Sequence, residues 1–148
     1  MITKLLPDQI AKFWPIIKYA VEESLPPTTG DHPDKMNRVL SSMLSGSTKV
    51  WVSYKHPDNK FEAVIVTKFI YDDDSGTKNL LIYCLYGYEP ISQDSWTEGA
   101  IALFKYAKAN RCSMIVAYTA NPLVVEIAKK YGADTSYTII TIDLSKIV

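Results

Sequence analysis

The stretch that decides the fold is NLLIYCLYGYEPISQDSWTEGAIALFKYAKANRCSMIVAYT, residues 79–119. Residues 79–88 form an apolar run rich in Leu, Ile and Tyr, which predicts a strand. Residues 96–110 repeat apolar side chains at helical spacing, and residues 113–119 form a second, short apolar strand. A strand, a helix and a strand in this order make a crossover connection, which favours parallel pairing of the two strands.

The chain before this stretch predicts two helices followed by an antiparallel meander. Apolar residues recur three and four apart in residues 8–24 and 33–45, which predicts two amphipathic helices. Residues 49–54 and 61–71 predict two strands that precede the strand at 79–88. The connections between these strands are short and rich in turn-forming residues, so we expect antiparallel neighbours.

After residue 119 the pattern predicts one more helix and one more strand. Asn121 is a preferred N-cap residue, Pro122 suits a first turn, and Gly132 is typical of a helix end. Residues 135–144 alternate well enough to predict a final strand. The expected order is α-α-β-β-β-α-β-α-β in a single domain over residues 1–148. We therefore expect an α/β (α+β) fold with a mixed, mostly antiparallel sheet and helices on both faces.

Composition and net charge limit the classes of ligand and partner that the protein could bind. Sixteen basic and sixteen acidic residues cancel, so charge gives no case for nucleic acid or an anionic membrane as partner. No stretch approaches the ~18 apolar residues of a membrane span. Cys84 and Cys112 lack a CxxC or Cys/His spacing, so we expect reduced thiols and a cytoplasmic protein. His32 and His56 stand alone in loops, and residues 72–76 lack the spacing of a calcium loop, so no metal site is expected.

The element order resembles the GCN5-related N-acetyltransferase (GNAT) superfamily. Residues 79–89 look like the central strand of that family. Residues 113–134 look like its next strand–helix unit, in which an Asn opens the helix and a Lys-x-x-Gly sequence closes it; here the closing reads Lys129-Lys130-Tyr131-Gly132-Ala133. The resemblance implies the family's fold over most of the chain. It also implies acetyl-CoA as the cofactor if the chain is active.

In this family the loop after the central strand usually reads Gln/Arg-x-x-Gly-x-Gly/Ala. Its backbone N–H groups and the helix N-terminus hold the pyrophosphate of acetyl-CoA, and glycine lets the backbone come close to the phosphate oxygens. The best match is residues 93–98, QDSWTE, in which Trp96 and Glu98 stand at the glycine positions. A second register, ending at Gly99-Ala100, gives a loop of the wrong length. The resemblance leaves four candidate cofactor-binding residues, Gln93, Ser95, Gly99 and Asn121.

The same residues also predict an ordinary helix start. Ser95 and Glu98 have the spacing of a capping box, and Asp94 adds negative charge at the positive end of the helix dipole. Trp96 continues the apolar stripe of Ala100, Leu103, Phe104 and Ala107, so we expect a largely buried indole. The protein itself would then occupy the donors that hold a pyrophosphate, and the carboxylates would repel it.

The general acid of the family is missing from its usual place. Many members carry a Tyr four residues before the closing Gly, where this chain has Ala128. Tyr131 adjoins that Gly at a position that we expect to pack in the core. A Tyr proton suits a thiolate leaving group, and Tyr118 or Tyr137 could substitute from a neighbouring strand.

Glu89 is the candidate general base. It ends the central strand, beside the place where the family opens a cleft between two splayed strands, and a carboxylate there could deprotonate an amine through water. A solvated strand end is the plainer explanation. Glu62 has the same ambiguity and is weaker because it starts a strand. Asn121 could contact CoA, although capping the next helix explains it without a ligand.

Two hypotheses from different classes remain open. The favoured one is a GNAT-fold protein with a degenerate acetyl-CoA loop that works as a non-catalytic structural or interaction module with a protein partner. It resembles the small acetyltransferase-like proteins of phages, some of them virion or packaging accessory proteins, which would place it in the host cytoplasm or the virion. The alternative is an acyl-CoA-dependent N-acetyltransferase acting on a small amine or a protein amine.

Further features fit either hypothesis. Residues 25–33, LPPTTGDHP, lie where the family builds its acceptor wall, and would form a substrate loop or a rigid protein contact. Tyr83, Tyr86 and Tyr88 would form a partner surface or pack on the sheet. A homo-oligomer is compatible with both hypotheses.

Overall fold

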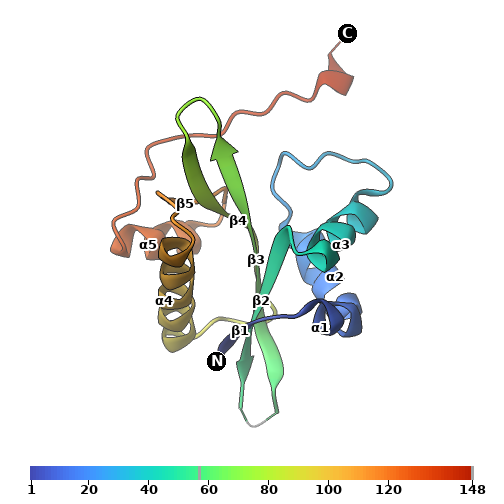
Figure 1. The fold of residues 1–148 in the computed structure, drawn as a ribbon, viewed down its shortest axis with the longest axis vertical. Helices are drawn as coiled ribbons and strands as arrows, with labels where there is room; N and C mark the ends of the chain where they lie inside the picture. The colour runs from blue at the N-terminus through green and yellow to red at the C-terminus, as the bar shows by residue number, and fades with distance from the viewer. Residues whose placement is uncertain (57, 148) are drawn as a thin grey trace.

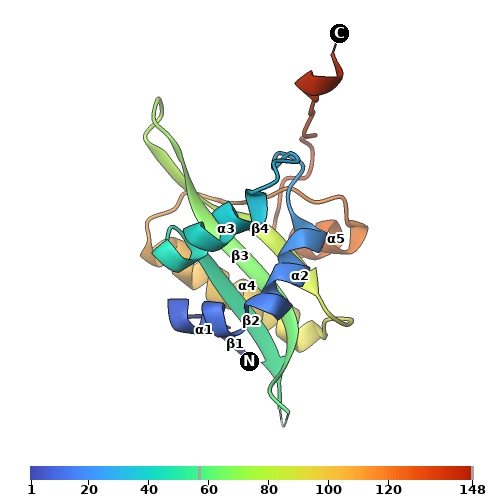
Figure 2. The same ribbon diagram turned by 90° about the vertical axis from the view of Figure 1, so that its right-hand side faces the viewer.

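A five-stranded sheet forms the centre of the computed structural model, which describes residues 1–56 and 58–147 (Figure 1). The strands lie side by side in the order in which they occur in the chain. Their bounds are β1 Ile2–Lys4, β2 Thr48–Lys55, β3 Lys60–Asp72, β4 Thr77–Gly87 and β5 Ile115–Ala117. Helices cover both faces of this sheet, as the sequence predicts (Figures 1 and 2).

The pairing of the strands follows the sequence prediction. β2, β3 and β4 form an antiparallel meander, in which Val66 of β3 lies opposite Val50 of β2. β5 pairs in parallel with the start of β4, with Ile115 opposite Leu80. Both the meander and the parallel crossover are therefore confirmed. Beyond Ile82 the pairing between β4 and β5 stops, so the second half of β4 is paired only with β3.

The pairing of β4 with β3 is interrupted by a bulge at Tyr83. Cys84 lies opposite Val66, and Ile82 lies opposite Thr67, so Tyr83 is the extra residue on β4. A bulge increases the local twist and redirects the side chains on either side of it. As a result Tyr83 and Cys84, although adjacent in the chain, both pack against the same hydrophobic cluster.

Three helices cover one face of the sheet: α1 Pro7–Lys12, α2 Trp14–Ser24 and α3 Lys35–Ser45 (Figure 2). The sequence predicted a single helix over residues 8–24, and this prediction is wrong at Phe13, where the backbone leaves the helical conformation (φ −99°, ψ 11°). Pro15 explains the break, because it has no N–H to donate to the carbonyl of Ala11 and its ring would clash with that carbonyl in a continuous helix. α3 ends at Gly46 in the left-handed conformation (φ 85°), as predicted.

The core on this face is a layer of aliphatic side chains. Ile17, Ala20 and Val21 of α2 are fully buried against the sheet. Their partners from the other elements are Ile10, Met43, Val50, Val52, Val64, Val66 and Cys84. The apolar residues of α2, at helical spacing, pack here against strand residues at two-residue spacing, as the sequence periodicity predicts.

Two helices lie on the other side of the sheet: α4 Gln93–Ala109 and α5 Pro122–Lys130. Leu103 of α4 packs on Trp51 of β2 and Ile65 of β3. The Trp51 indole N–H donates to the Thr67 hydroxyl at 3.0 Å, which satisfies the buried donor. α5 differs from α4, because none of its residues is buried. No helix within the described residues is long and apolar enough to cross a membrane.

Two ends of the chain depart from the prediction. β1 was missed, since three residues are too few for a periodic pattern to appear. The predicted strand at residues 135–144 is wrong, because this segment forms no strand and contains only a short 3-10 turn, Leu144–Lys146. The alternating residues give the segment strand propensity, but a strand also needs a neighbouring strand with which to pair. The C-terminal segment, residues 133–147, instead lies exposed beyond the helices (Figures 1 and 2).

Candidate functional site

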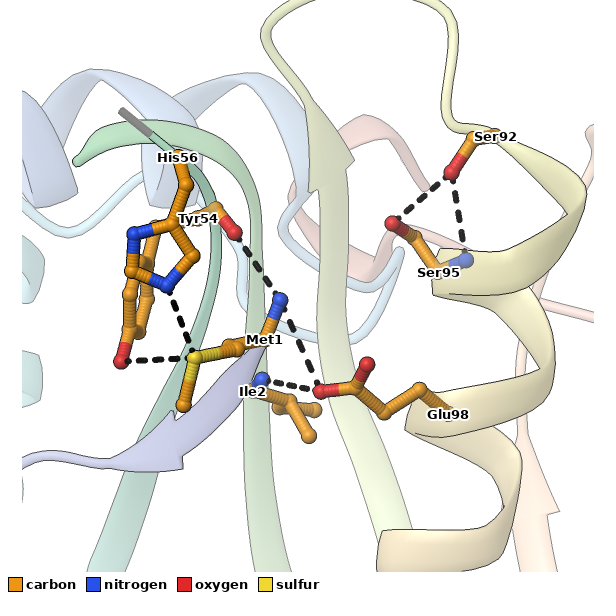
Figure 3. A network of polar contacts seen from close by, with 7 residues as sticks. All are labelled: Met1, Ile2, Tyr54, His56, Ser92, Ser95 and Glu98. Atoms are coloured by element: carbon orange, nitrogen blue, oxygen red, sulfur yellow. Dashed lines mark hydrogen bonds and ion pairs between the residues drawn. The ribbon is translucent and has the colours of Figure 1, made fainter. Parts of the chain in front are cut away.

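The start of α4 is capped by Ser92. Its backbone is extended (φ −66°, ψ 155°), and its hydroxyl accepts from the Ser95 N–H at 3.2 Å and donates to the Ser95 hydroxyl at 2.9 Å (Figure 3). The Trp96 N–H donates to the Ser92 carbonyl at 3.0 Å. The predicted capping box of Ser95 and Glu98 is therefore wrong, because the helix begins one turn earlier. The apolar stripe that guided the prediction starts inside the helix and not at its end.

Glu98 is used to hold β1. Its Oε1 accepts from the Ile2 N–H at 2.6 Å and lies 3.6 Å from the Met1 amine, which also donates to the Tyr54 carbonyl at 2.9 Å (Figure 3). This charge-assisted contact fastens α4 to the edge of the sheet. Glu98 therefore does not bind the N–H groups of the first helical turn, which contradicts the prediction from the sequence.

Two backbone donors at the start of α4 have no partner in the described part of the chain. No hydrogen bond among the described residues uses the N–H groups of Gln93 or Asp94. Both residues are exposed, so these N–H groups face solvent at the positive end of the helix dipole. An anion could approach them, although the Asp94 carboxylate in the same turn opposes it.

Trp96 and Gly99 lie on the side of α4 that faces the protein. Trp96 is half-buried, so the prediction of a largely buried indole is wrong in degree. Gly99 is buried, and a Cβ built there would lie 3.8 Å from the Ile2 Cδ1 and 3.9 Å from the Ile65 Cδ1. A Cβ at Gly99 would therefore make ordinary van der Waals contacts, so packing against the sheet does not require glycine here, and its part in cofactor binding remains a prediction.

A buried carboxylate lies near the end of β4. The Lys55 Nζ donates to the Glu89 Oε1 at 2.7 Å and lies 3.3 Å from the Glu62 Oε2. The Glu62 side chain has no exposed surface, and the Lys55 ammonium is its ion-pair partner, although neither Glu62 oxygen has a hydrogen bond of good geometry among the described residues. The sequence marks Glu62 and Glu89 only as separate acids, because their shared partner Lys55 lies 34 positions from Glu89 and leaves no local signal. Removing a carboxylate from water is costly, so this acid cluster, Lys55, Glu62 and Glu89, is a candidate site.

The charges of Lys55 and Glu89 persist over a broad pH range. The hydrogen bond from Lys55 lowers the pKa of Glu89 below its ordinary value of 4.5, and the hydrogen bond to Glu89 raises the pKa of Lys55 above 10.5. Glu89 therefore contributes stability above pH 4.5 and loses it as the pH falls through its folded-state pKa. Lys55 contributes stability below pH 10.5 and loses it as the pH rises through its own. Between those limits both groups stay ionised.

Tyrosines join α2 to the end of β4. The Tyr88 hydroxyl donates to the Ile16 carbonyl at 2.8 Å, and burial raises the pKa of Tyr88 to about 12. The Tyr86 ring lies 5.3 Å from Tyr88 and 5.7 Å from Tyr19. These rings pack against the helices, while Tyr19 stays largely exposed at the surface. The tyrosines of β4 for which the sequence left a partner surface or sheet packing open therefore pack mostly on the sheet.

The other candidate site residues predicted from the sequence are distant from the acid cluster along the chain. Asn121 caps α5, since its Oδ1 accepts at 2.9 Å from an N–H two residues on. Tyr118 follows β5 and is partly exposed. Tyr131 is exposed, so the expected core position is wrong, and Tyr137 lies in the C-terminal segment and not on a neighbouring strand. Among the described residues no cluster of His, Cys, Asp and Glu could hold a metal ion.

Comparison with solved structures assigns the fold. An aminoglycoside acetyltransferase from an uncultured soil metagenomic sample, solved with sisomicin, matches at a TM-score of 0.70 and 14% identity, over 97% of this chain and 93% of that one. A predicted acetyltransferase from Clostridium acetobutylicum, solved with acetyl-CoA, matches at 0.69 and 18%, over 99% and 97%. The ribosomal-protein-alanine N-acetyltransferase of Brucella melitensis biovar Abortus 2308 matches at 0.62 and 12%, over 97% and 99%.

These matches show that the chain has the GNAT fold, which confirms the fold predicted from the sequence. Comparison of the sequence with protein-family models and with curated proteins gives no match. At such low identities the likeness establishes the arrangement of the elements, and function has to be argued from the residues.

Replacing the true cap should weaken the fold. We expect Ser92→Ala to lower the free energy of unfolding by ~1 kcal/mol, because the Ser95 N–H loses its partner. Ser95→Ala is the matched control and should cost less than ~0.5 kcal/mol. Urea denaturation of both variants measures the difference. An equal loss in the two variants, or a larger loss for Ser95→Ala, would return the cap to Ser95.

The acid cluster gives a prediction for pH dependence. Lys55→Met should move the pKa of Glu89 up toward 4.5, because the hydrogen bond that favours the carboxylate is gone. Lys60→Met is the control, since Lys60 lowers the same pKa only by a weaker, longer-range attraction. A carboxyl-carbon NMR titration of the three proteins gives the values directly. If both variants shift Glu89 equally, the ion pair with Lys55 does not form in solution.

Proposed function

We propose that this chain binds an acyl-CoA at the start of α4 and transfers its acyl group to an amine held near Glu89. One observation carries the proposal: the unpartnered N–H groups at the helix start and the acid cluster lie at the same end of β4. Glu89 and Gln93 are four positions apart, and four residues reach at most about 14 Å. A thioester and an amine bound at these two places would lie close enough to react.

The helix start supplies the anion site. The exposed N–H groups of Gln93 and Asp94 and the positive end of the α4 dipole are the features that bind phosphate groups in proteins. The solved structure from Clostridium acetobutylicum contains acetyl-CoA and shares this fold, which supports the same ligand here. Asp94 and the missing glycines argue for weaker binding than a glycine-rich loop would give.

The acid cluster supplies the amine site. Glu62 and Glu89 already bind one ammonium group, that of Lys55, and an acceptor amine carries the same chemistry. In the transfer the amine nitrogen bonds to the acyl carbon and the carbon–sulfur bond breaks. Glu89 would take one proton from the bound ammonium, directly or through water, to give the neutral amine that attacks. The second proton, lost from nitrogen as the amide forms, would pass to solvent, and a residue such as Tyr118 would give a proton to the thiolate. Bound acetyl-CoA would contribute the acyl group and the thiolate leaving group.

A second candidate is a non-catalytic interaction protein on the same fold. The observation that favours it is Trp96 and Glu98 at the positions where the family has glycines, with Glu98 engaged in holding β1. Such a protein would use its surface for a protein partner, for example as an accessory protein of a phage virion. It would neither bind acyl-CoA nor release CoA thiol.

The transfer reaction tests the first candidate. The full chain is incubated with acetyl-CoA and a panel of small amines and amine-bearing peptides, while released thiol and the mass of each amine are measured. We expect transfer by the native protein, and a fall of about 100-fold for Glu89→Gln, since general-base catalysis contributes that much. Glu126→Gln is the matched control, because Glu126 also pairs with a lysine at the surface, at 3.4 Å, and should leave the rate unchanged.

The two candidates give different outcomes. No thiol release with any amine, together with no heat of binding at millimolar acetyl-CoA, would reject the acyltransferase and leave the interaction protein. Equal rates for the native protein and Glu89→Gln would retain the transferase and reject the role of the acid cluster.

A further inference from the structure

A small polar cavity lies between α3 and the sheet, on the face opposite α4 (Figure 1). Its volume is about 180 Å³. The residues that line this α3 cavity come from one helix and three strands: Arg38, Val39 and Ser42 of α3, Thr48 of β2, Lys68 of β3 and Tyr83 of β4. A water molecule takes about 30 Å³ in the liquid, so the cavity has room for one small polar group and not for a whole cofactor.

The strand register brings three of these residues together. Thr48 lies directly opposite Lys68 in the pairing of β2 with β3, and directly opposite residues have Cβ atoms about 5 Å apart on one face. Val50 and Val66, each two residues away on the same strands, belong to the core under α1, α2 and α3. Alternation therefore turns Thr48 and Lys68 toward the same helices. Tyr83 joins them because the bulge of β4 turns it to this face.

The charged groups of the α3 cavity are both cations. No ion pair among the described residues involves Arg38 or Lys68. Asp34, which precedes α3, lines a neighbouring groove and not this cavity. The Lys68 Nζ lies 5.7 Å from the centre of the Tyr83 ring, a contact that holds the ammonium beside the cavity. Burial raises the pKa of Tyr83, so its phenol stays neutral and no anion of the cavity wall balances the two cations.

Hydroxyl groups supply further donors to the α3 cavity. Ser42 lies one turn after Arg38 on the same side of α3, and its hydroxyl is 3.2 Å from that of Ser47. Thr48 is only 5% exposed and lines the cavity from β2. Two cations that share a small cavity repel each other, and an anion placed between them turns that repulsion into attraction. An arginine fork and a lysine ammonium are the side chains that most often bind phosphate oxygens.

We propose that the α3 cavity binds the phosphate group of a small molecule, held by Arg38 and Lys68 together with the hydroxyls of Ser42 and Thr48. A phosphate group presents its oxygens in several directions, which suits donors on a helix and on the strands beneath it. A carboxylate presents two oxygens in one plane. The cavity has two cations and the charges of the whole chain cancel, so a polyanion such as nucleic acid would find no extended basic surface.

The α3 cavity is separate from the places used in the proposed acyl transfer. The start of α4 lies on the other side of the sheet (Figure 1). Lys68 and Glu62 are six residues apart on β3, which is about 20 Å along an extended strand. The proposal therefore does not rest on the proposed function.

A titration of the labelled full chain with inorganic phosphate, followed by amide NMR at constant ionic strength, tests the proposal. We expect saturable shifts at Ser42, Thr48 and Lys68 that chloride does not reproduce, because simple screening by salt is the same in both titrations. Arg38→Gln and Lys68→Met should each raise the phosphate dissociation constant about tenfold or more, since each removes a charge-assisted hydrogen bond. Arg38 is exposed and Met keeps most of the lysine stem, so both variants should stay folded.

Two matched variants control for the loss of charge alone. Lys78→Met removes another lysine that lies over an aromatic ring of the sheet, 4.1 Å from the centre of Phe69. Arg111→Gln removes an arginine just after the end of α4. Neither residue lines the α3 cavity, so both variants should bind phosphate as the native protein does.

Four results would overturn the proposal. No saturable shift at millimolar phosphate would mean that the α3 cavity does not bind an anion. Shifts at Gln93 and Asp94 alone would place the phosphate at the start of α4. An equal loss of affinity in the control variants would mean that general charge, and not this cavity, attracts phosphate. Acetate that binds at the same residues as tightly as phosphate would make the ligand group a carboxylate.

Discussion

The pairing of β3 with its two neighbours is the constraint on which the rest of the structure depends. Both faces of β3 are buried: Val64 and Val66 face the layer of α1, α2 and α3, while Ile65 faces α4. A slip of one residue would exchange these faces and place every apolar side chain against the wrong layer. Fixing this register also fixes where β4 ends, and thereby where α4 starts and where Glu89 meets Lys55.

The sequence predicts the parts of the fold that repeat with a clear period. The meander, the parallel crossover, α3 and the caps at Asn121 and Gly132 follow from alternation, helical spacing and capping residues, and all are present. The failures lie where a long-range contact decides. Ser92 rather than Ser95 caps α4, and Glu98 binds the backbone of β1, which is too short to leave a pattern. The segment at 135–144 has strand propensity, but no strand of the described sheet pairs with it.

The candidate site shows the same limit more strongly. Glu89 and Gln93 could be selected from the sequence, because both lie at the end of a predicted strand. Lys55 and Glu62 could not be joined to them, since only the β2–β3–β4 register brings the three charged groups together. The N–H groups of Gln93 and Asp94 at the start of α4 have no partner among the described residues. The buried carboxylate of Glu62 lies near Glu89. Both features favour ligand binding at this end of the sheet.

The central claim is that acyl-CoA binds at the start of α4, and a titration followed by amide NMR tests it most directly. Adding acetyl-CoA to the labelled full chain should shift the amide signals of Gln93 and Asp94 progressively to saturation, because their N–H groups acquire phosphate acceptors. The amides of Asp73 and Asp74, in the hairpin between β3 and β4, should stay in place. Unchanged signals at Gln93 and Asp94 at millimolar acetyl-CoA would contradict the claim.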